Sequence, residues 1–542
     1  MLGKLSVLDV VIVGVYFAVV FLIGWWSSRK SQADAKSYFL GGGSIGWMAI
    51  GASLFASNIS AEHFIGLAGS GATSGLAVGQ FEWLACFILL ILGWFFVPFY
   101  LRTGVFTMPE FLERRYNRGC RNYLSAVSLI AYVFTKVSVA VYAGALVLRT
   151  ILGWNMYVGA VVLLAATGVY TVFGGLRAVI YTDFLQCLIL IGGGVVLTVL
   201  ALQQPEIGGF AGLTAQLPPS FFSVWKGVQD ADFPWTGILF GAPILGVWYW
   251  CTDQMIVQRT LAADGLKSAR SATVFAGFLK ILPVFILVLP GLAGAVLFRG
   301  VAPDEMYATL VDRLLPTGVK GLVVAALLAA LMSSLSSVFN SSSTLVVMDF
   351  YRKFRPAAPE KELVRAGQVA TIGVVIIGVL WLPFIGKMSN QLYVYLQSVQ
   401  AYISPPIAVV FLLGLLWRRL NGAGALAALL TGFALGAFRF VAEIGWKVGW
   451  RWVVDREALV YFATINFLHF AVLLFGVSAA VFVAVSYLTR PPAPEKMNVF
   501  AADAKETVKL DTGDRFNAGL SILLGAIIVA LWIVFSPLVF HS

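Results

Sequence analysis

The second long apolar segment of the chain contains a polar run, Gly51-Ala-Ser-Leu-Phe-Ala-Ser-Asn-Ile-Ser-Ala-Glu-His-Phe-Ile-Gly66. Ser57, Asn58 and His63 make it too polar for a helix that faces lipid. Ser and Asn side chains also compete for backbone hydrogen bonds. We therefore predict a helix interrupted within the membrane, whose freed carbonyls could bind a cation and whose half-helix ends could face a solute. The alternative is a polar contact between two helices.

The composition around this stretch makes lipid the solvent. The 542 residues are 60% hydrophobic and 12% charged, whereas a soluble domain carries about 25% charged residues. Only helices and closed barrels can span a bilayer, and the apolar runs are too long for barrel strands of about 10 residues. The sequence therefore predicts an all-α polytopic membrane protein, one transmembrane domain over residues 1–542. It shows no nucleophile–base pair, so an enzyme is the least expected class.

Apolar segments of the right length predict about fourteen spans of about 20 residues each. They cover residues 7–27, 46–74, 78–101, 121–150, 156–174, 178–203, 235–258, 270–299, 319–350, 363–385, 389–416, 422–444, 459–488 and 517–540. If the N-terminus lies outside, most of the 37 Lys and Arg residues fall in inner loops, as the positive-inside rule requires. We expect both termini outside. The net charge of +11 then reflects basic inner loops rather than a nucleic-acid partner.

A second interrupted helix is predicted at residues 235–258. Gly and Pro residues weaken its first half, and Trp248, Tyr249 and Trp250 precede polar residues in its second half. Such aromatic faces can stack on the apolar faces of a sugar ring; the alternative is an interfacial aromatic belt. Interrupted helices at matching places in two halves indicate a secondary transporter. The halves would each hold five spans, in opposite orientations.

The ninth span carries the third polar cluster. Ser333, Ser336 and Ser337 share one helix face at positions i, i+3 and i+4. Hydroxyl oxygens suit a hard cation, although small residues on one face can also serve helix packing. Seven serines within eleven residues exceed what packing needs, so we favour cation binding.

Single polar residues inside other spans complete the candidate site. Glu82 and Gln397 could accept or donate hydrogen bonds to hydroxyl groups, and Lys280 could donate to a solute or to a carboxylate. Asp183 could neutralise a cation near the inner end, or pair with a nearby arginine. Lys136 is expected to pair structurally or to extend toward the interface.

Five motifs resemble the solute:sodium symporter family, and within it the sodium/glucose (galactose) cotransporters, over nearly the whole chain. They are Ala52-Ser-Leu-Phe-Ala-Ser-Asn-Ile-Ser60, Phe81-Glu-Trp83, Trp248-Tyr-Trp-Cys-Thr-Asp-Gln-Met-Ile-Val-Gln-Arg259, Leu331-Met-Ser-Ser-Leu-Ser-Ser337 and Tyr402-Ile-Ser-Pro-Pro-Ile407. The resemblance implies alternating access and a LeuT-type 5+5 inverted repeat. The expected organisation is a leading helix at 7–27, repeats at 46–203 and 235–416, and three C-terminal helices at 422–540.

The resemblance also implies roles for individual residues. The sugar site would use Asn58, His63, Glu82, Trp250, Lys280 and Gln397, with Tyr249 as the inner gate. The main Na⁺ site would use carbonyls of Ala56, Ile59 and Ala330 with hydroxyls of Ser333 and Ser334. A second Na⁺ site would use Asp183, Ser333, Ser336 and Ser337. Two sodium ions per sugar are therefore expected.

Three positions depart from the family patterns: Val394, Ala85 and Gly246 each stand where a polar or hydroxyl residue occurs in some members. They leave glucose, galactose and other polyols open. The expected function is sodium-coupled hexose symport across the plasma membrane, or the inner membrane of a bacterium. The alternatives are symport of myo-inositol, an amino acid or an organic acid, which Lys280 could attract, and a sugar sensor that does not transport. The expected partners are the sugar, sodium and the bilayer, without an obligate protein.

Overall fold

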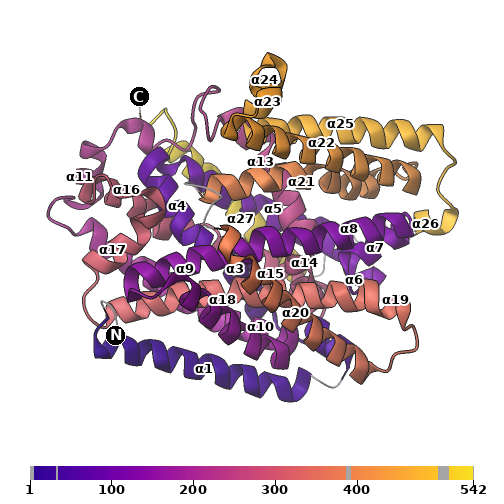
Figure 1. The fold of residues 1–542 in the computed structure, drawn as a ribbon, viewed down its shortest axis with the longest axis horizontal. Coiled ribbons are helices and arrows are strands. Elements are labelled where there is room, and N and C mark those ends of the chain that lie inside the picture. The colour runs from indigo at the N-terminus through magenta and orange to yellow at the C-terminus, as the bar shows by residue number, and fades with distance from the viewer. Residues whose placement is uncertain (1–4, 32–33, 386–391, 499–511, 541–542) are drawn as a thin grey trace.

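A computed structural model describes residues 5–31, 34–385, 392–498 and 512–540 (Figure 1). These residues form helices joined mainly by short connectors, and within them β structure is limited to two isolated bridges. The all-α architecture predicted from composition is confirmed. The first residues of the predicted span 389–416 lie outside the described residues, as does most of the connector before the last helix.

The helices of the first half extend from the N-terminus into the long connector at 204–234, which contains α11. They are α1 (Val7–Ser31), α2 (Ala35–Leu40), α3 (Trp47–Asn58), α4 (Ala61–Ser74), α5 (Gln80–Ile91), α6 (Val97–Thr103), α7 (Met108–Arg115), α8 (Arg118–Ala131), α9 (Ser138–Leu152), α10 (Met156–Leu202) and α11 (Gly209–Gln216).

The second half contains the remaining helices. They are α12 (Trp235–Phe240), α13 (Ala242–Gly246), α14 (Gln254–Leu261), α15 (Leu266–Leu279), α16 (Leu289–Leu297), α17 (Met306–Leu314), α18 (Val319–Leu345), α19 (Arg352–Phe354), α20 (Glu360–Ile385), α21 (Leu392–Leu416), α22 (Gly422–Val448), α23 (Arg451–Val454), α24 (Glu457–Thr464), α25 (Phe467–Leu488), α26 (Pro494–Asn498) and α27 (Thr512–Val534). Several spans continue through π-helical turns, at Leu92–Phe96, Tyr132–Val137, Val247–Thr252, Val284–Val288 and Val346–Tyr351.

The second span is interrupted where its polar run predicted. α3 ends at Asn58, and Ile59 and Ser60 are extended before α4 begins at Ala61. The Ser60 and His63 side chains form a capping box at the start of α4, which satisfies backbone groups that the break leaves without helical partners. The polar residues of this span therefore stabilise its interruption.

The seventh span is interrupted as well, at its polar end rather than in its glycine-rich half. The π turn Val247–Thr252 ends at Asp253, whose backbone is extended (φ −75°, ψ 128°). The Asp253 carboxylate then caps α14 by accepting the Met255 N–H at 2.9 Å. The two interruptions bring free helix ends into the protein interior.

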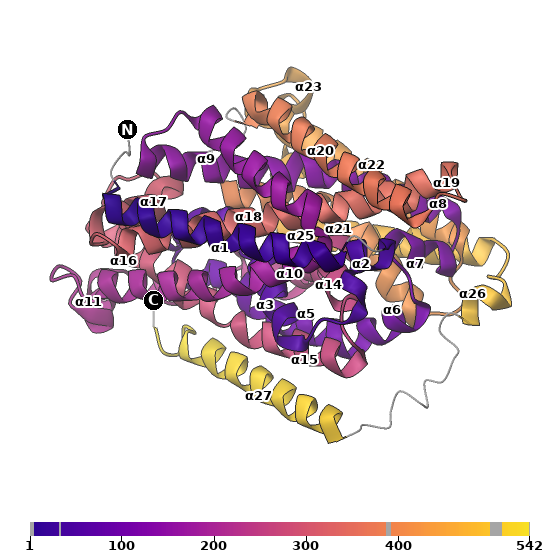
Figure 2. The ribbon, with the colours of Figure 1, turned by 90° about the horizontal axis from the view of Figure 1, so that it is seen from below.

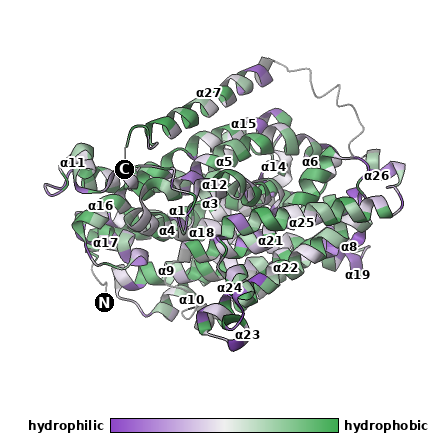
Figure 3. Ribbon diagram, turned by 90° about the horizontal axis from the view of Figure 1, so that it is seen from above, coloured by the Kyte–Doolittle hydropathy of each residue, from purple (hydrophilic) through white to green (hydrophobic). Residues whose placement is uncertain are grey.

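Most helices run along one common direction, which makes them a bundle of membrane-crossing elements (Figure 1). Eleven helical stretches among the described residues are long and apolar enough to cross a membrane. The N- and C-terminal ends of the drawn chain lie toward the same end of the bundle as α11, and α19 and α26 lie at the opposite end (Figures 1 and 2). Apolar residues dominate the helices, and hydrophilic residues gather near bundle ends such as α19 (Figure 3).

The predicted spans 156–174 and 178–203 join in the single element α10. Its only non-helical residue is Gly175, with φ 57° and ψ −164°, a backbone conformation essentially restricted to glycine. The boundary between the two predicted spans is therefore the single residue Gly175 and not a loop of several residues. The number fourteen stays a prediction.

Candidate functional site

One cavity beside the two interrupted helices gathers all six residues predicted for the sugar site. Asn58, His63, Glu82, Trp250, Lys280 and Gln397 line it together with Tyr249. They come from six separate elements: the end of α3, the starts of α4 and α5, the π turn before Asp253, the end of α15, and α21. The tertiary fold therefore brings together residues spread over more than 300 positions of sequence.

Lys280 is the centre of the polar side of this cavity. Its Nζ donates hydrogen bonds to Asn58 Oδ1 and to Glu82 Oε2, and it lies 5.5 Å from the centre of the Trp250 ring. His63 Nε2 lies 3.6 Å from Glu82 Oε1. Because Lys280 and Glu82 are both buried, each offsets the charge of the other, and the cluster presents directional hydrogen-bonding groups without excess charge.

Gln397 approaches the cavity from α21. Within the described part of the chain, neither Gln397 nor the neighbouring Gln400 uses its side-chain amide in a hydrogen bond with the protein, and both line the cavity. Gln400 was not predicted. Its spacing from Gln397, three residues along one helix, would have placed it on the same face.

Aromatic rings enclose the cavity at the end nearest the 204–234 connector. Phe81 and Tyr393 line the cavity, with ring centres 6.1 Å apart. Phe81 also contacts Phe233 of the connector at 6.0 Å. No local sequence pattern indicates these contacts, because they join residues from three distant segments.

Tyr249, the predicted inner gate, packs against a buried ion pair. Lys136 Nζ lies 4.8 Å from the centre of the Tyr249 ring and 2.5 Å from Asp253 Oδ2. Tyr132 donates its O–H to the other oxygen of Asp253. Lys136 therefore forms a structural ion pair, which is one of the two roles expected from the sequence. This pair connects the fourth span to the interruption of the seventh.

The residues predicted for the main Na⁺ site are Ala56, Ile59, Ala330, Ser333 and Ser334, and all five are buried. Ser334 Oγ donates to the Ser57 carbonyl at 3.3 Å, which places α18 against the last turn of α3. The α18 hydroxyls thus lie beside the interruption whose carbonyls the prediction invokes.

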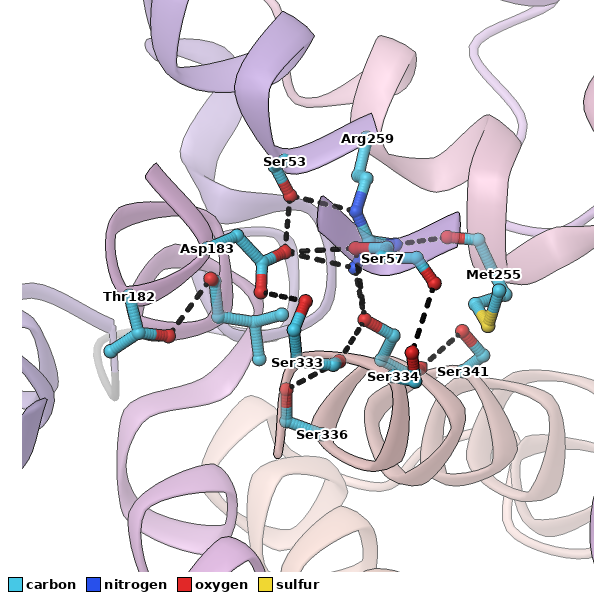
Figure 4. A network of polar contacts seen from close by, with 12 residues as sticks. Ser53, Ser57, Thr182, Asp183, Met255, Arg259, Ser333, Ser334, Ser336 and Ser341 are labelled. Carbon is cyan, nitrogen blue, oxygen red and sulfur yellow. Dashed lines mark hydrogen bonds and ion pairs between the residues drawn. The ribbon is translucent and has the colours of Figure 1, made fainter. Parts of the chain in front are cut away.

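Asp183 of α10 lies in a dense hydroxyl cluster next to this point (Figure 4). Its Oδ1 accepts from Ser333 Oγ at 2.6 Å, and its Oδ2 accepts from Ser53 Oγ at 2.5 Å and from Ser57 Oγ at 2.9 Å. Ser53 was not predicted, although its i, i+4 spacing from Ser57 is the signal that could have found it.

The other two residues of the predicted second site are placed differently. Ser336 Oγ and Ser337 Oγ both donate to the Ser333 carbonyl, at 2.9 and 2.6 Å. Ser337 Oγ also lies 3.1 Å from Ser57 Oγ. Ser333 therefore contacts Asp183 directly, whereas the Ser336 hydroxyl hydrogen-bonds to the backbone of its own helix.

The cluster also holds Arg259, which follows directly after the predicted span 235–258. Its Nη2 lies 3.3 Å from Asp183 Oδ2, and both side chains are fully buried. The alternative role given to Asp183 from the sequence, a salt bridge to an arginine, is therefore the one seen in this structure. No local pattern around Arg259 distinguishes it from a loop arginine.

The groups in these two neighbouring sites are suited to binding a solute and a cation. Hydroxyl, carbonyl and carboxylate oxygens are ligands of hard cations. Among the described residues, no group of three or more His, Cys, Asp or Glu side chains could hold a metal ion. A polar cavity next to an oxygen-rich cluster, both formed at interrupted membrane helices, is the arrangement of a secondary transporter.

The fold agrees with this class. A Na⁺-coupled sialic acid symporter, solved in a substrate-bound outward-open state, superposes with a TM-score of 0.76 over 90% of this chain and 99% of that chain, at 22% identity. The nucleobase-cation symporter Mhp1, closed around bromovinylhydantoin, gives a TM-score of 0.55 over 87% of this chain and all of that chain, at 18% identity. The LeuT-type fold is thereby confirmed.

The chain belongs to the Sodium:solute symporter family, whose profile matches residues 38–432. It is therefore a sodium-coupled membrane transporter and not an enzyme. Similar proteins include a sodium/glucose cotransporter 4 from Mus musculus, at 42% identity over 90% of this chain and 76% of that protein. A sodium/myo-inositol cotransporter from Homo sapiens is 40% identical over 92% of this chain and 75% of its own length. A sodium/mannose cotransporter from Bos taurus is 44% identical over 90% of this chain and 88% of its own length.

Proposed function

We propose that this symporter couples sodium to the uptake of a hexose, glucose or galactose, across the plasma membrane by alternating access, with two Na⁺ per sugar. The observation that carries the proposal is the pairing of two sites on one interrupted helix. Asn58 at the end of α3 lines the polar aromatic cavity, and Ser57, one residue earlier, contacts Asp183 in the hydroxyl cluster. A change in the α3 break would therefore reach both sites.

The cavity suits a polyhydroxylated ring. Trp250 and Tyr249 offer flat faces, and Asn58, Glu82 and Gln397 offer hydrogen-bond donors and acceptors. The ammonium of Lys280 is already paired with Glu82, so an anionic solute would have to compete with that carboxylate. The names of the similar proteins, which specify glucose, myo-inositol and mannose, agree with a neutral polyol.

The residue roles follow from the same reasoning. We assign Asn58, His63, Glu82, Trp250, Lys280 and Gln397 to the sugar, and Tyr249 to the inner gate. The main Na⁺ site comprises Ala56, Ile59, Ala330, Ser333 and Ser334. The second comprises Asp183, Ser333, Ser336 and Ser337, supported by the Ser333–Asp183 hydrogen bond of 2.6 Å.

The membrane organisation belongs to the same proposal. The two inverted repeats cover 46–203 and 235–416, after a leading helix at 7–27 and before three helices at 422–540. Both termini lie outside. The position of both drawn chain ends toward one end of the bundle (Figure 1) supports an even number of spans.

A second candidate substrate is myo-inositol, favoured by the sodium/myo-inositol cotransporters among the similar proteins. Val394, Ala85 and Gly246 remove hydroxyl contacts that would otherwise favour one hexose. Uptake of labelled glucose, galactose, mannose and myo-inositol into proteoliposomes, each with and without an inward sodium gradient, distinguishes the candidates. Equal hexose uptake when potassium replaces sodium would contradict the coupling. Sugar binding without uptake would instead support a sensor.

A further inference from the structure

Arg259 holds an unusual position for a basic residue of a membrane protein. It lies in the last turn of α14 with none of its side chain exposed. Its guanidinium reaches three other helices: Nε donates to Ser53 Oγ of α3 at 2.8 Å, Nη2 contacts Asp183 of α10 at 3.3 Å, and Nη2 also donates to Ser337 Oγ of α18. Figure 4 shows the guanidinium directed at the Asp183 hydroxyl cluster.

These contacts involve two residues of the proposed second sodium site, Asp183 and Ser337, and the neighbouring Ser53. Asp183 Oδ2 and the hydroxyl oxygens of Ser53 and Ser337 all accept hydrogen bonds from Arg259. Each of these hydrogen bonds occupies one acceptor site of its oxygen and directs the positive charge of the guanidinium at it. A sodium ion at Asp183 would therefore share these oxygens with a second cation.

Charge balance leads to the same conclusion. Three buried carboxylates lie around the interrupted helices, and each has its own basic partner: Glu82 with Lys280, Asp253 with Lys136, and Asp183 with Arg259. A sodium ion added to the Asp183 cluster would leave a net positive charge in a buried site. An uncompensated buried ion is strongly unfavourable, so sodium would enter only as the guanidinium leaves.

We propose that Arg259 is a tethered cation that competes with the second sodium ion for Asp183. Sodium at Asp183 releases the guanidinium, and with it the contacts that hold α14 against α3, α10 and α18. In the absence of sodium the pair keeps these four helices together. Filling of the second ion site is thereby linked to movement of the inner half of the interrupted seventh span. This inference rests on the proposed second Na⁺ site.

The test is the sodium dependence of thermal stability for purified protein in detergent, titrated with NaCl against choline chloride at constant ionic strength. Arg259→Gln removes the competing charge and leaves Asp183 without a buried counter-ion. We expect it to melt below the wild type in choline, to recover in sodium, and to reach half of its sodium effect at about tenfold lower sodium. This lies within the 5–150-fold range of typical coupling between sites.

Three further variants make the result specific. Arg259→Lys keeps the positive charge and should keep the wild-type sodium dependence. Arg259→Gln combined with Asp183→Asn removes both charges and should lose the high sodium affinity. Arg270→Gln breaks a partly buried pair, in which Arg270 Nη1 lies 2.8 Å from Asp514 Oδ1, and should lower the melting temperature equally in choline and in sodium.

If sodium stabilises the wild type and the Arg259→Gln variant has the same half-saturating sodium concentration, the proposed competition is wrong, whereas the sodium coupling still stands. A wild type whose stability ignores sodium would contradict the proposed coupling itself. Should Arg259→Gln not fold, Asp183→Asn in choline replaces it. Competition predicts a lower melting temperature without sodium, because Arg259 loses its partner; unchanged stability in choline would overturn the proposal.

Discussion

Replacement of Lys136 by methionine should destabilise the protein because it leaves a buried carboxylate without its counter-ion. Lys136 Nζ lies 2.5 Å from Asp253 Oδ2, and the two side chains are 9% and 2% exposed. Removing one partner of a buried pair costs about 3–5 kcal/mol. Asp253 keeps the hydrogen bonds from the Tyr132 O–H and the Met255 N–H, so we expect the lower value, about 3 kcal/mol.

A double-mutant cycle separates the ion pair from other effects of these substitutions. Asp253→Asn should cost a similar amount, because the buried Lys136 then loses its negatively charged partner and keeps uncharged neighbours such as the Tyr249 ring and Met255 Sδ. The double variant Lys136→Met/Asp253→Asn buries no charge at this position and should lose about as much as one single variant. The expected coupling energy is therefore about 3 kcal/mol, the upper part of the range for residues in contact.

The assay is unfolding of purified protein in mixed micelles by increasing mole fraction of SDS, followed by tryptophan fluorescence. Lys447→Met is the control, because Lys447 pairs with Glu443 on an exposed helix surface and should cost less than about 0.5 kcal/mol. A double variant whose loss equals the sum of the two single losses would refute the reasoning, since it would show that Lys136 and Asp253 act independently.

Three other substitutions test the sites and the packing. Gln397→Ala should weaken sugar affinity about tenfold, the equivalent of one hydrogen bond, while sodium-dependent stabilisation persists; unchanged uptake kinetics would reject its role. Asp183→Asn should lower the Na⁺:sugar ratio, measured from reversal potentials, from two toward one; a wild-type ratio of one would defeat the second site. Gly291→Ala should cost about 1–3 kcal/mol, because an added Cβ would lie 2.1 Å from the Ala68 carbonyl oxygen. Gly192→Ala, which meets nothing within 4 Å, is its control, and equal losses would contradict the packing argument.

Local sequence determined the features of this protein that depend on solvent and on neighbouring residues. Apolar length and low charge specified membrane helices, because unpaired backbone groups are too costly in hydrocarbon. The run from Ser57 to His63 specified an interruption, because those side chains satisfy the freed backbone groups themselves; the Ser60–His63 capping box does so. The family motifs then identified a sodium symporter.

The tertiary structure alone decided which charges neutralise each other. Nothing in the sequence around Lys136, Arg259 or Lys280 specifies a carboxylate 117, 76 or 198 positions away. Ion pairing depends on distance in space, and the helices set that distance only when they pack. The predicted span ends at residue 258 and would place Arg259 in a loop, yet the Arg259 side chain is fully buried against Asp183. The sequence thus located the polar groups within the membrane, and the packing of α3, α10, α14 and α18 determined which of them remain available for sodium.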